Sequence, residues 1–201
     1  SGTTVFVMAV TFMVQAQDNL PTKEQQIQAA ISAAPQEMQQ EAAVMGYNQE
    51  GALVTLREGK GDLICLADDP GDSRFHVACY LKDLEPFMRR GRELRAAGKS
   101  REEVMSARRT EIESGDLEFP DSPVALYSLT GPENGFDYAG GTVREATPLR
   151  VVYIPYATIE ATGITGKPTG PGSPWLMDPG KPWAHIMIPG NPITAESDIS
   201  D

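Results

Sequence analysis

The two cysteines of the chain, Cys65 and Cys79, place the strongest constraint on its fold. Each lies in a short apolar run typical of a β-strand, and the turn-forming residues 68–72 separate the two runs. In an exported protein this pattern predicts one disulfide between neighbouring strands, with Cα atoms about 5.5–6 Å apart. The alternative is metal binding, but the chain has neither a CxxC pair nor closely spaced histidines.

The pattern around the cysteines predicts short strands alternating with Gly, Asp and Pro turns. The first group, read as an antiparallel meander, comprises residues 43–45, 53–56, 63–66 and 75–80. Further strands are expected at residues 124–129, 149–156, 174–177 and 182–189. The polar, Gly-rich segment 130–147 has the composition of a surface loop.

Helical periodicity appears in two places. A capping box, Thr22-x-x-Gln25, predicts a helix that either ends at Pro35 or is kinked there and continues over residues 36–41. Residues 81–114 predict two helices, because Gly98 interrupts the apolar stripe and Ser100-x-x-Glu103 forms a second capping box.

These elements predict an α+β fold, an antiparallel β-sheet with helices packed on one face, preceded by an apolar N-terminal segment. The expected divisions are a signal peptide or retained membrane anchor over residues 1–16, a helical lever over 17–41, the α+β domain over 42–190 and a tail over 191–201. In the sheet we expect Leu53, Leu56, Ile64, Val151, Tyr153 and Ile186 to be buried, with Leu84, Met88 and Leu94 packing a helix against it.

The N-terminal residues bear on the compartment. Residues 5–14 are uncharged and nearly all apolar, and Val14-Gln15-Ala16 fits a signal-peptidase site. We therefore expect a periplasmic or extracellular protein, tethered to the membrane if this segment is retained. The residues that would contact lipid or a partner are Val5, Phe6, Val7, Met8, Val10, Phe12, Met13 and Val14.

The formal net charge of −11 disfavours nucleic acid as a partner. Residues 82–113 nevertheless carry nine basic and seven acidic side chains. This local excess predicts a basic ridge facing an acidic partner or an anionic lipid surface, although a solvated helix face with internal ion pairs is the plainer interpretation. The ridge consists of Arg89, Arg90, Arg92 and Arg95.

No motif in the chain predicts catalysis, a metal or a cofactor. The loop at Gly163 lacks the spacing and the hydroxyl of a phosphate loop, and Ser173 lacks the glycines of a nucleophile elbow. Asp68, Asp69 and Asp72 could hold calcium, but turn formation explains them as well. A candidate ligand surface remains on the C-terminal hairpin. It comprises Trp175, Trp183 and His185.

Three motifs also occur together in a fixed order: Leu56-Arg57-Glu58-Gly59, Cys65-Leu66-Ala67-Asp68 with the later Cys79, and residues 182–189 (Pro-Trp-Ala-His-Ile-Met-Ile-Pro). This set resembles a group of uncharacterised secreted proteins from environmental bacteria. The resemblance implies export and paired cysteines, and it implies no activity.

The sequence therefore predicts a non-catalytic structural or interaction module on the periplasmic side of the membrane. It would be an accessory subunit of an envelope complex, such as a photosynthetic or respiratory one, with other envelope proteins as partners and no cofactor. The alternatives are a free ligand-binding protein that uses Trp175 and Trp183, and a hydrolase with His185 as its base.

Overall fold

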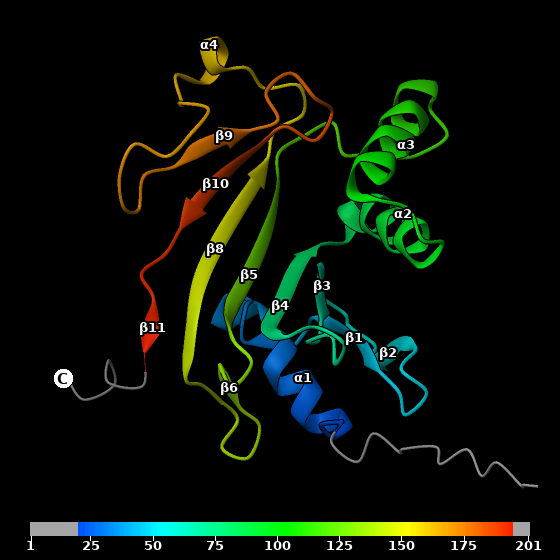
Figure 1. The fold of residues 1–201 in the computed structure, drawn as a ribbon, viewed down its shortest axis with the longest axis vertical. Coiled ribbons are helices and arrows are strands. Elements are labelled where there is room, and N and C mark those ends of the chain that lie inside the picture. The colour runs from blue at the N-terminus through cyan, green and yellow to red at the C-terminus, as the bar shows by residue number, and fades with distance from the viewer. Residues whose placement is uncertain (1–19, 195–201) are drawn as a thin grey trace, which may run out of the picture.

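The computed structural model describes residues 20–194 (Figure 1). The apolar segment expected to act as a signal or anchor, residues 5–14, lies outside the described residues, as does most of the expected tail. Within residues 20–194, no helix combines the length and the apolar character needed to cross a membrane.

A nine-stranded sheet forms the body of the fold. Its strand order is β2-β1-β3-β4-β5-β8-β10-β9, with β11 pairing beside β10 along β8. Every pairing is antiparallel except that of β1 with β3. The strands are β1 Ala43–Tyr47, β2 Leu53–Arg57, β3 Leu63–Leu66, β4 Arg74–Leu81, β5 Val124–Pro132, β8 Glu145–Tyr153, β9 Trp175–Met177, β10 His185–Pro189 and β11 Ile193–Thr194. The predicted α+β class is confirmed.

The first three strands do not form the expected meander. After β2 the chain crosses to the far side of β1, so β3 lies parallel to β1. The crossing is tight, because a Cβ on Gly59 would collide with the backbone of Ala42 and Ala43. The amide of Gly61 donates to the carbonyl of Glu41 at 2.8 Å, which holds the crossing chain in place.

The disulfide between Cys65 and Cys79 is present, as predicted. The two residues lie directly opposite each other on β3 and β4, and both are fully buried. Their Cα atoms are 4.0 Å apart, closer than expected. Directly opposed residues of antiparallel strands approach to about 4.5 Å, which accounts for the short distance. Such a bond is typical of an oxidising, extracytoplasmic compartment.

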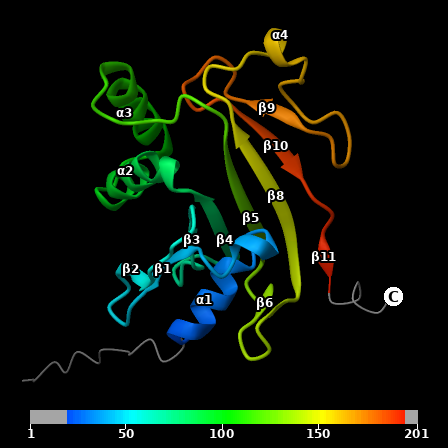
Figure 2. The same cartoon turned by 180° about the vertical axis from the view of Figure 1, so that it is seen from behind.

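The helices flank the sheet. They are α1 Lys23–Ile31, α2 Glu85–Ala96, α3 Arg101–Ser114 and α4 Ile159–Thr162, with short 3₁₀ turns at η1 Gln36–Met38 and η2 Lys82–Leu84. Both predicted capping boxes are present, at Thr22 with Gln25 and at Ser100 with Glu103. Figure 2 shows α2 and α3 on one side of the long strands β5 and β8, and β9 and β10 on the other.

Strand alternation assigns the helices to opposite faces of the sheet. Leu63, Cys65 and Cys79 pack with α1. Their neighbours Ile64 and Tyr80 point the other way and pack with α2 and α3. The helices of residues 81–114 thus cover one face, as predicted. The segment expected to be a separate lever forms α1, which packs on the other face.

The predicted core is found in part. Val151, Tyr153, Leu84 and Leu94 are buried, and Ile64, Met88 and Ile186 are partly buried. Leu53 and Leu56 are also only partly buried, because β2 is an edge strand and has no neighbour on one side within the described part of the chain.

The expected surface loop 130–147 is instead structured. It contains the ends of β5 and β8 and a small hairpin, β6 Phe136–Asp137 with β7 Thr142–Val143. The Phe136 ring is buried and stacks on Phe75 with centroids 5.6 Å apart.

Candidate functional site

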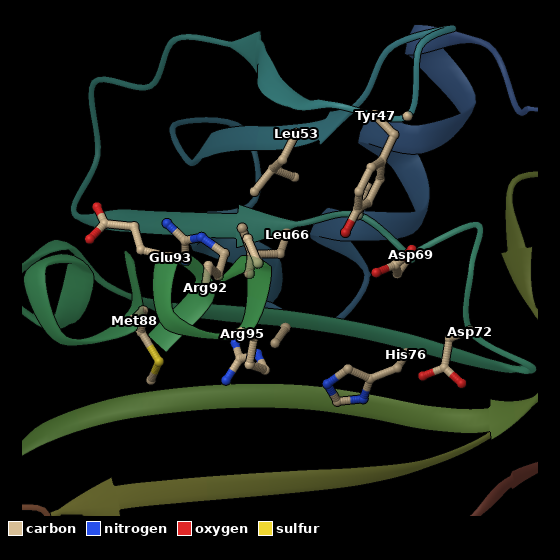
Figure 3. Close-up of a pocket in the computed structure, with 14 residues that line it drawn as sticks. Tyr47, Leu53, Leu66, Asp69, Asp72, His76, Met88, Arg92, Glu93 and Arg95 are labelled. Atoms are coloured by element: carbon tan, nitrogen blue, oxygen red, sulfur yellow. The ribbon is translucent and has the colours of Figure 1, made fainter. Parts of the chain in front are cut away.

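A groove of about 620 Å³ opens on the α2 face of the sheet, between α2 and the β1–β2 hairpin (Figure 3). It exists because α2 packs over β4, β5 and β8, which leaves the outer part of the same face without a helix above it. Side chains from four strands, the β3–β4 turn and one helix therefore meet around one hollow.

The middle of the groove is apolar. Leu66 and Ala78 come from the neighbouring strands β3 and β4, and Leu53 comes from the edge strand β2. Met88 adds a flexible thioether from α2, a side chain that adapts to irregular ligands. These side chains are only partly buried, so a bound segment would cover apolar surface that water now contacts.

Most of the charged side chains are separated along the groove. Asp69 and Asp72, on the β3–β4 turn, lie at one end, and Arg92, Glu93 and Arg95, on α2, lie toward the other (Figure 3). Glu93 is paired with Arg89 at 3.8 Å and with Arg90 at 3.3 Å, so the unpaired charge at this end is positive. Tyr47 lines the groove together with Asp69, and burial, followed by the negative charge of this carboxylate, raises the pKa of Tyr47 to about 12. Tyr47 therefore stays neutral and serves as a fixed wall of the acidic end.

Arg92 is held in place by its neighbours. Its guanidinium donates to Glu85 at 2.7 Å and to the Tyr80 hydroxyl at 3.1 Å, and Tyr80 in turn donates to Glu85 at 2.6 Å. Burial opposes the charge on Arg92, but Tyr80 and Glu85 outweigh it and raise its pKa. Arg92 is thus a positioned cation, whereas Arg95 has no ion-pair partner among residues 20–194.

His76 lines the acidic end but is not arranged as a catalytic base. Its Nδ1 lies 2.9 Å from the Thr130 hydroxyl, and the Asp68 carboxylate accepts from its backbone amide rather than from its ring. Burial, followed by Arg74, lowers the pKa of His76 and favours the neutral ring. No carboxylate orients this ring within the described part of the chain, so the arrangement lacks the relay of a hydrolytic triad.

Asp68 lies beside the groove with an unusual environment. Its carboxylate accepts from the His76 amide at 2.8 Å and from the Tyr138 hydroxyl at 3.5 Å. Burial raises the pKa of Asp68 to about 6, and these hydrogen bonds only partly oppose that effect. The carboxyl group therefore changes its charge slightly below neutral pH, next to the acidic end of the groove.

No family model, curated protein or solved structure matches this chain. The chemistry of the groove must accordingly be inferred from its own residues.

The predicted basic ridge is not one surface. Arg89 pairs with Glu93 at 3.8 Å, and Arg90 pairs with Glu111 on α3 at 2.7 Å. Arg92 lines the groove and pairs with Glu85 at 2.7 Å. Because successive helix positions differ by about 100°, four arginines within seven positions are spread around α2 and cannot all face one partner.

The C-terminal hairpin does not present its two tryptophans together. Trp183 is buried and stacks on Phe87 with centroids 6.0 Å apart, and its Nε1 donates to Asp178 at 3.1 Å. Trp183 is therefore a core residue rather than part of a ligand surface. Trp175 and His185 stay partly exposed on the same face of the sheet.

The other candidates from the sequence have local partners. The Nδ1 of His185 lies 2.7 Å from the Trp183 carbonyl, and the Ser173 hydroxyl bonds to the backbone of residues 169 and 170. Asp69 accepts from the Gly71 amide at 2.8 Å, as expected of a turn residue. Within residues 20–194, no cluster of three or more His, Cys, Asp or Glu side chains could hold a metal ion.

The sequence marked four of these charged residues as candidates, but it did not predict that they line one groove. They are Asp69, Asp72, Arg92 and Arg95. Their meeting depends on the crossing that puts β3 next to β1, and the only local signal for that crossing is the Gly59-Lys60-Gly61 segment.

Proposed function

We propose that this chain is a non-catalytic interaction module on the periplasmic side of a bacterial membrane, and that the groove beside α2 binds a peptide segment of its partner. In this proposal it is an accessory subunit of an envelope assembly, such as a photosynthetic or respiratory complex. The disulfide supports the compartment, and the apolar residues 5–14 support a membrane tether.

The separation of charge along the groove carries the proposal. Asp69 and Asp72 would meet a cationic side chain, Arg92 and Arg95 would meet a carboxylate, and Leu53, Leu66 and Met88 would cover the apolar residues between them. A peptide segment supplies all three kinds of group in one ligand. Charges at the rim would orient the segment, and the apolar middle would provide most of the affinity.

The edge strand adds a second reason. Among residues 20–194, β2 has a neighbour only on its β1 side, so its outer backbone groups could pair with an extended peptide. Leu53 belongs to this strand and also lines the groove. A peptide in the groove would therefore lie close to unpaired backbone donors and acceptors.

The test is the size of the native assembly in cells that make the protein. Membranes are solubilised in mild detergent, and the chain is followed on a native gel. The proposal expects a large complex for the natural protein. Ala96→Trp should reduce the share of protein in that complex by about tenfold, because the new ring occupies the groove from an exposed position on α2.

Thr110→Trp is the matched control, since Thr110 is exposed on α3 and does not line the groove. It should assemble normally. Circular dichroism spectra must show that both variants fold. A natural protein that migrates only as a free monomer, or equal assembly of the two variants, would contradict the proposal.

A further inference from the structure

A second pocket, of about 330 Å³, lies between α2 and α3 and is lined by four cations and two apolar side chains. These residues are Arg95, Lys99, Arg101, Arg108, Val104 and Met105. None of them is acidic. Such a concentration of positive charge is unexpected in a chain whose net charge is −11.

Arg108 is the most constrained of the four. It is only 7% exposed, and its guanidinium lies 3.7 Å from the centre of the Phe87 ring. Nη1 donates to the Phe87 carbonyl at 3.0 Å and Nη2 lies 2.8 Å from the Met105 sulfur, but Nε is buried without a partner. No carboxylate within residues 20–194 forms an ion pair with Arg108. A buried charge without a counter-ion is rare in a folded protein.

Gly91 makes this arrangement possible. A Cβ at Gly91 would lie 2.8 Å from Nη1 of Arg108 and 3.4 Å from Nη1 of Arg95, so a larger residue would displace both guanidinium groups. The two cations are therefore close neighbours across the helix pair. Burial, followed by the charge of Arg95, lowers the pKa of Arg108 to about 10, which still leaves it charged at neutral pH.

The contrast with the rest of the helix pair is informative. Arginines that do not line this pocket are neutralised within the domain. These pairs are Arg89 with Glu93, Arg90 with Glu111, Arg92 with Glu85 and Arg109 with Glu113. Of the four cations at the pocket, Lys99 alone has an ion-pair partner within the described residues, Glu103 at 3.0 Å. The arginines of α2 and α3 that have no ion-pair partner within residues 20–194 therefore all line this pocket. This arrangement is expected of a site that binds an anionic ligand.

We propose that this pocket binds a phosphate group, either as inorganic phosphate or as the headgroup of an anionic phospholipid. Guanidinium groups bind tetrahedral oxyanions through paired N–H donors, and Arg95 and Arg101 are available for such contacts at the pocket rim. Arg108 supplies charge from below, and Val104 and Met105 form an apolar wall. Arg95 lines the groove as well, but the other five residues of the pocket do not, and phosphate binding there does not require a peptide in the groove.

A site built for phosphate should distinguish phosphate from chloride, whereas a general excess of positive charge should not. The first experiment therefore titrates the full 201-residue chain with sodium phosphate, at ionic strength matched by sodium chloride, and follows thermal unfolding and the heat of binding. Phosphate should stabilise the protein and chloride should not. Arg95→Gln with Arg101→Gln should weaken phosphate binding by about tenfold or more.

Arg109→Gln is the control, because this exposed arginine of the same helix already pairs with Glu113. It should bind phosphate as the natural protein does. Leu53→Glu tests the location, since it adds a negative charge to the groove, where it would repel an anion, and leaves the pocket unchanged. Loss of phosphate binding in Leu53→Glu would place the anion in the groove and overturn the proposal.

A second experiment identifies the source of the phosphate. Flotation with phosphatidylcholine vesicles, with and without phosphatidylglycerol, compares the Arg95/Arg101 double variant with Arg109→Gln. If Arg109→Gln floats better than the double variant on anionic vesicles, the phosphate belongs to a lipid headgroup. If the two proteins float equally but only Arg109→Gln binds phosphate in the titration, the ligand is the free anion. If the double variant and the control behave alike in both experiments, the proposal is overturned.

Discussion

Removing the disulfide should strongly destabilise the fold. Cys65 and Cys79 are separated by 14 positions, and a closed loop of this length lowers the entropy of the unfolded chain by an amount that contributes about 3 kcal/mol. Both residues are fully buried, so Cys65→Ala with Cys79→Ala also leaves a small cavity that costs about 1 kcal/mol. The double variant should therefore lose about 4 kcal/mol of unfolding free energy and melt about 10 °C lower.

The assay is urea unfolding followed by tryptophan fluorescence, because Trp183 lies in the core that packs against α2. The natural protein, unfolded in the presence of a reducing agent, serves as the control. It loses the loop constraint but keeps both sulfur atoms, so its stability should fall between those of the other two samples. A loss below about 1 kcal/mol in the double variant would refute the loop-entropy argument, since it would mean that the other pairings already restrict the unfolded chain.

Two further predictions concern stability. Asp68 has a pKa of about 6 in the folded protein and an ordinary value of 3.8. The folded protein therefore binds this proton more tightly than the unfolded chain does. Above pH 6 the charged carboxylate lowers the free energy of unfolding, and this loss disappears as the pH falls through 6 toward 4. Asp68→Asn should accordingly stabilise the protein by about 2 kcal/mol more at pH 7.5 than at pH 4.5, as measured by urea unfolding. An equal effect at both pH values would contradict the burial of this carboxylate. Gly59→Ala should lower the free energy of unfolding by about 3 kcal/mol, because its Cβ would collide with the backbone at Ala42 and Ala43. Gly170 has open space around it, so Gly170→Ala should leave the stability nearly unchanged in the same assay.

Local features of the fold could be predicted from the sequence because short-range chemistry determines them. The hydroxyl of Thr22 caps α1 and that of Ser100 caps α3, and in each case the partner lies three residues away. The disulfide was predictable for a similar reason, since Cys65 and Cys79 lie on consecutive strands joined by a short turn.

Features that depend on distant segments could not be predicted. Trp183 follows a proline in a short apolar run, a pattern shared with Trp175, yet only Trp183 meets Phe87 of α2 and becomes buried. Similarly, the periodicity of α2 predicts its apolar stripe but not the ion pairs of its arginines. Arg90 pairs with Glu111 on the next helix, whereas Arg95 has no carboxylate partner within residues 20–194. The groove could not be predicted either, because it forms only when β3 lies next to β1 and α2 lies beside both.

Site-specific photo-crosslinking in cells that make the protein tests the central claim most directly, which is that the groove beside α2 holds a partner. A photoreactive side chain at Ala96 lies at the groove, and one at Thr110 lies on the exposed face of α3. The account predicts that light links position 96 to one defined envelope protein, through a peptide whose charged residues complement Asp69 and Arg95, and that position 110 gives no such product. Equal products from both positions, or none from position 96 in a folded protein, would contradict it.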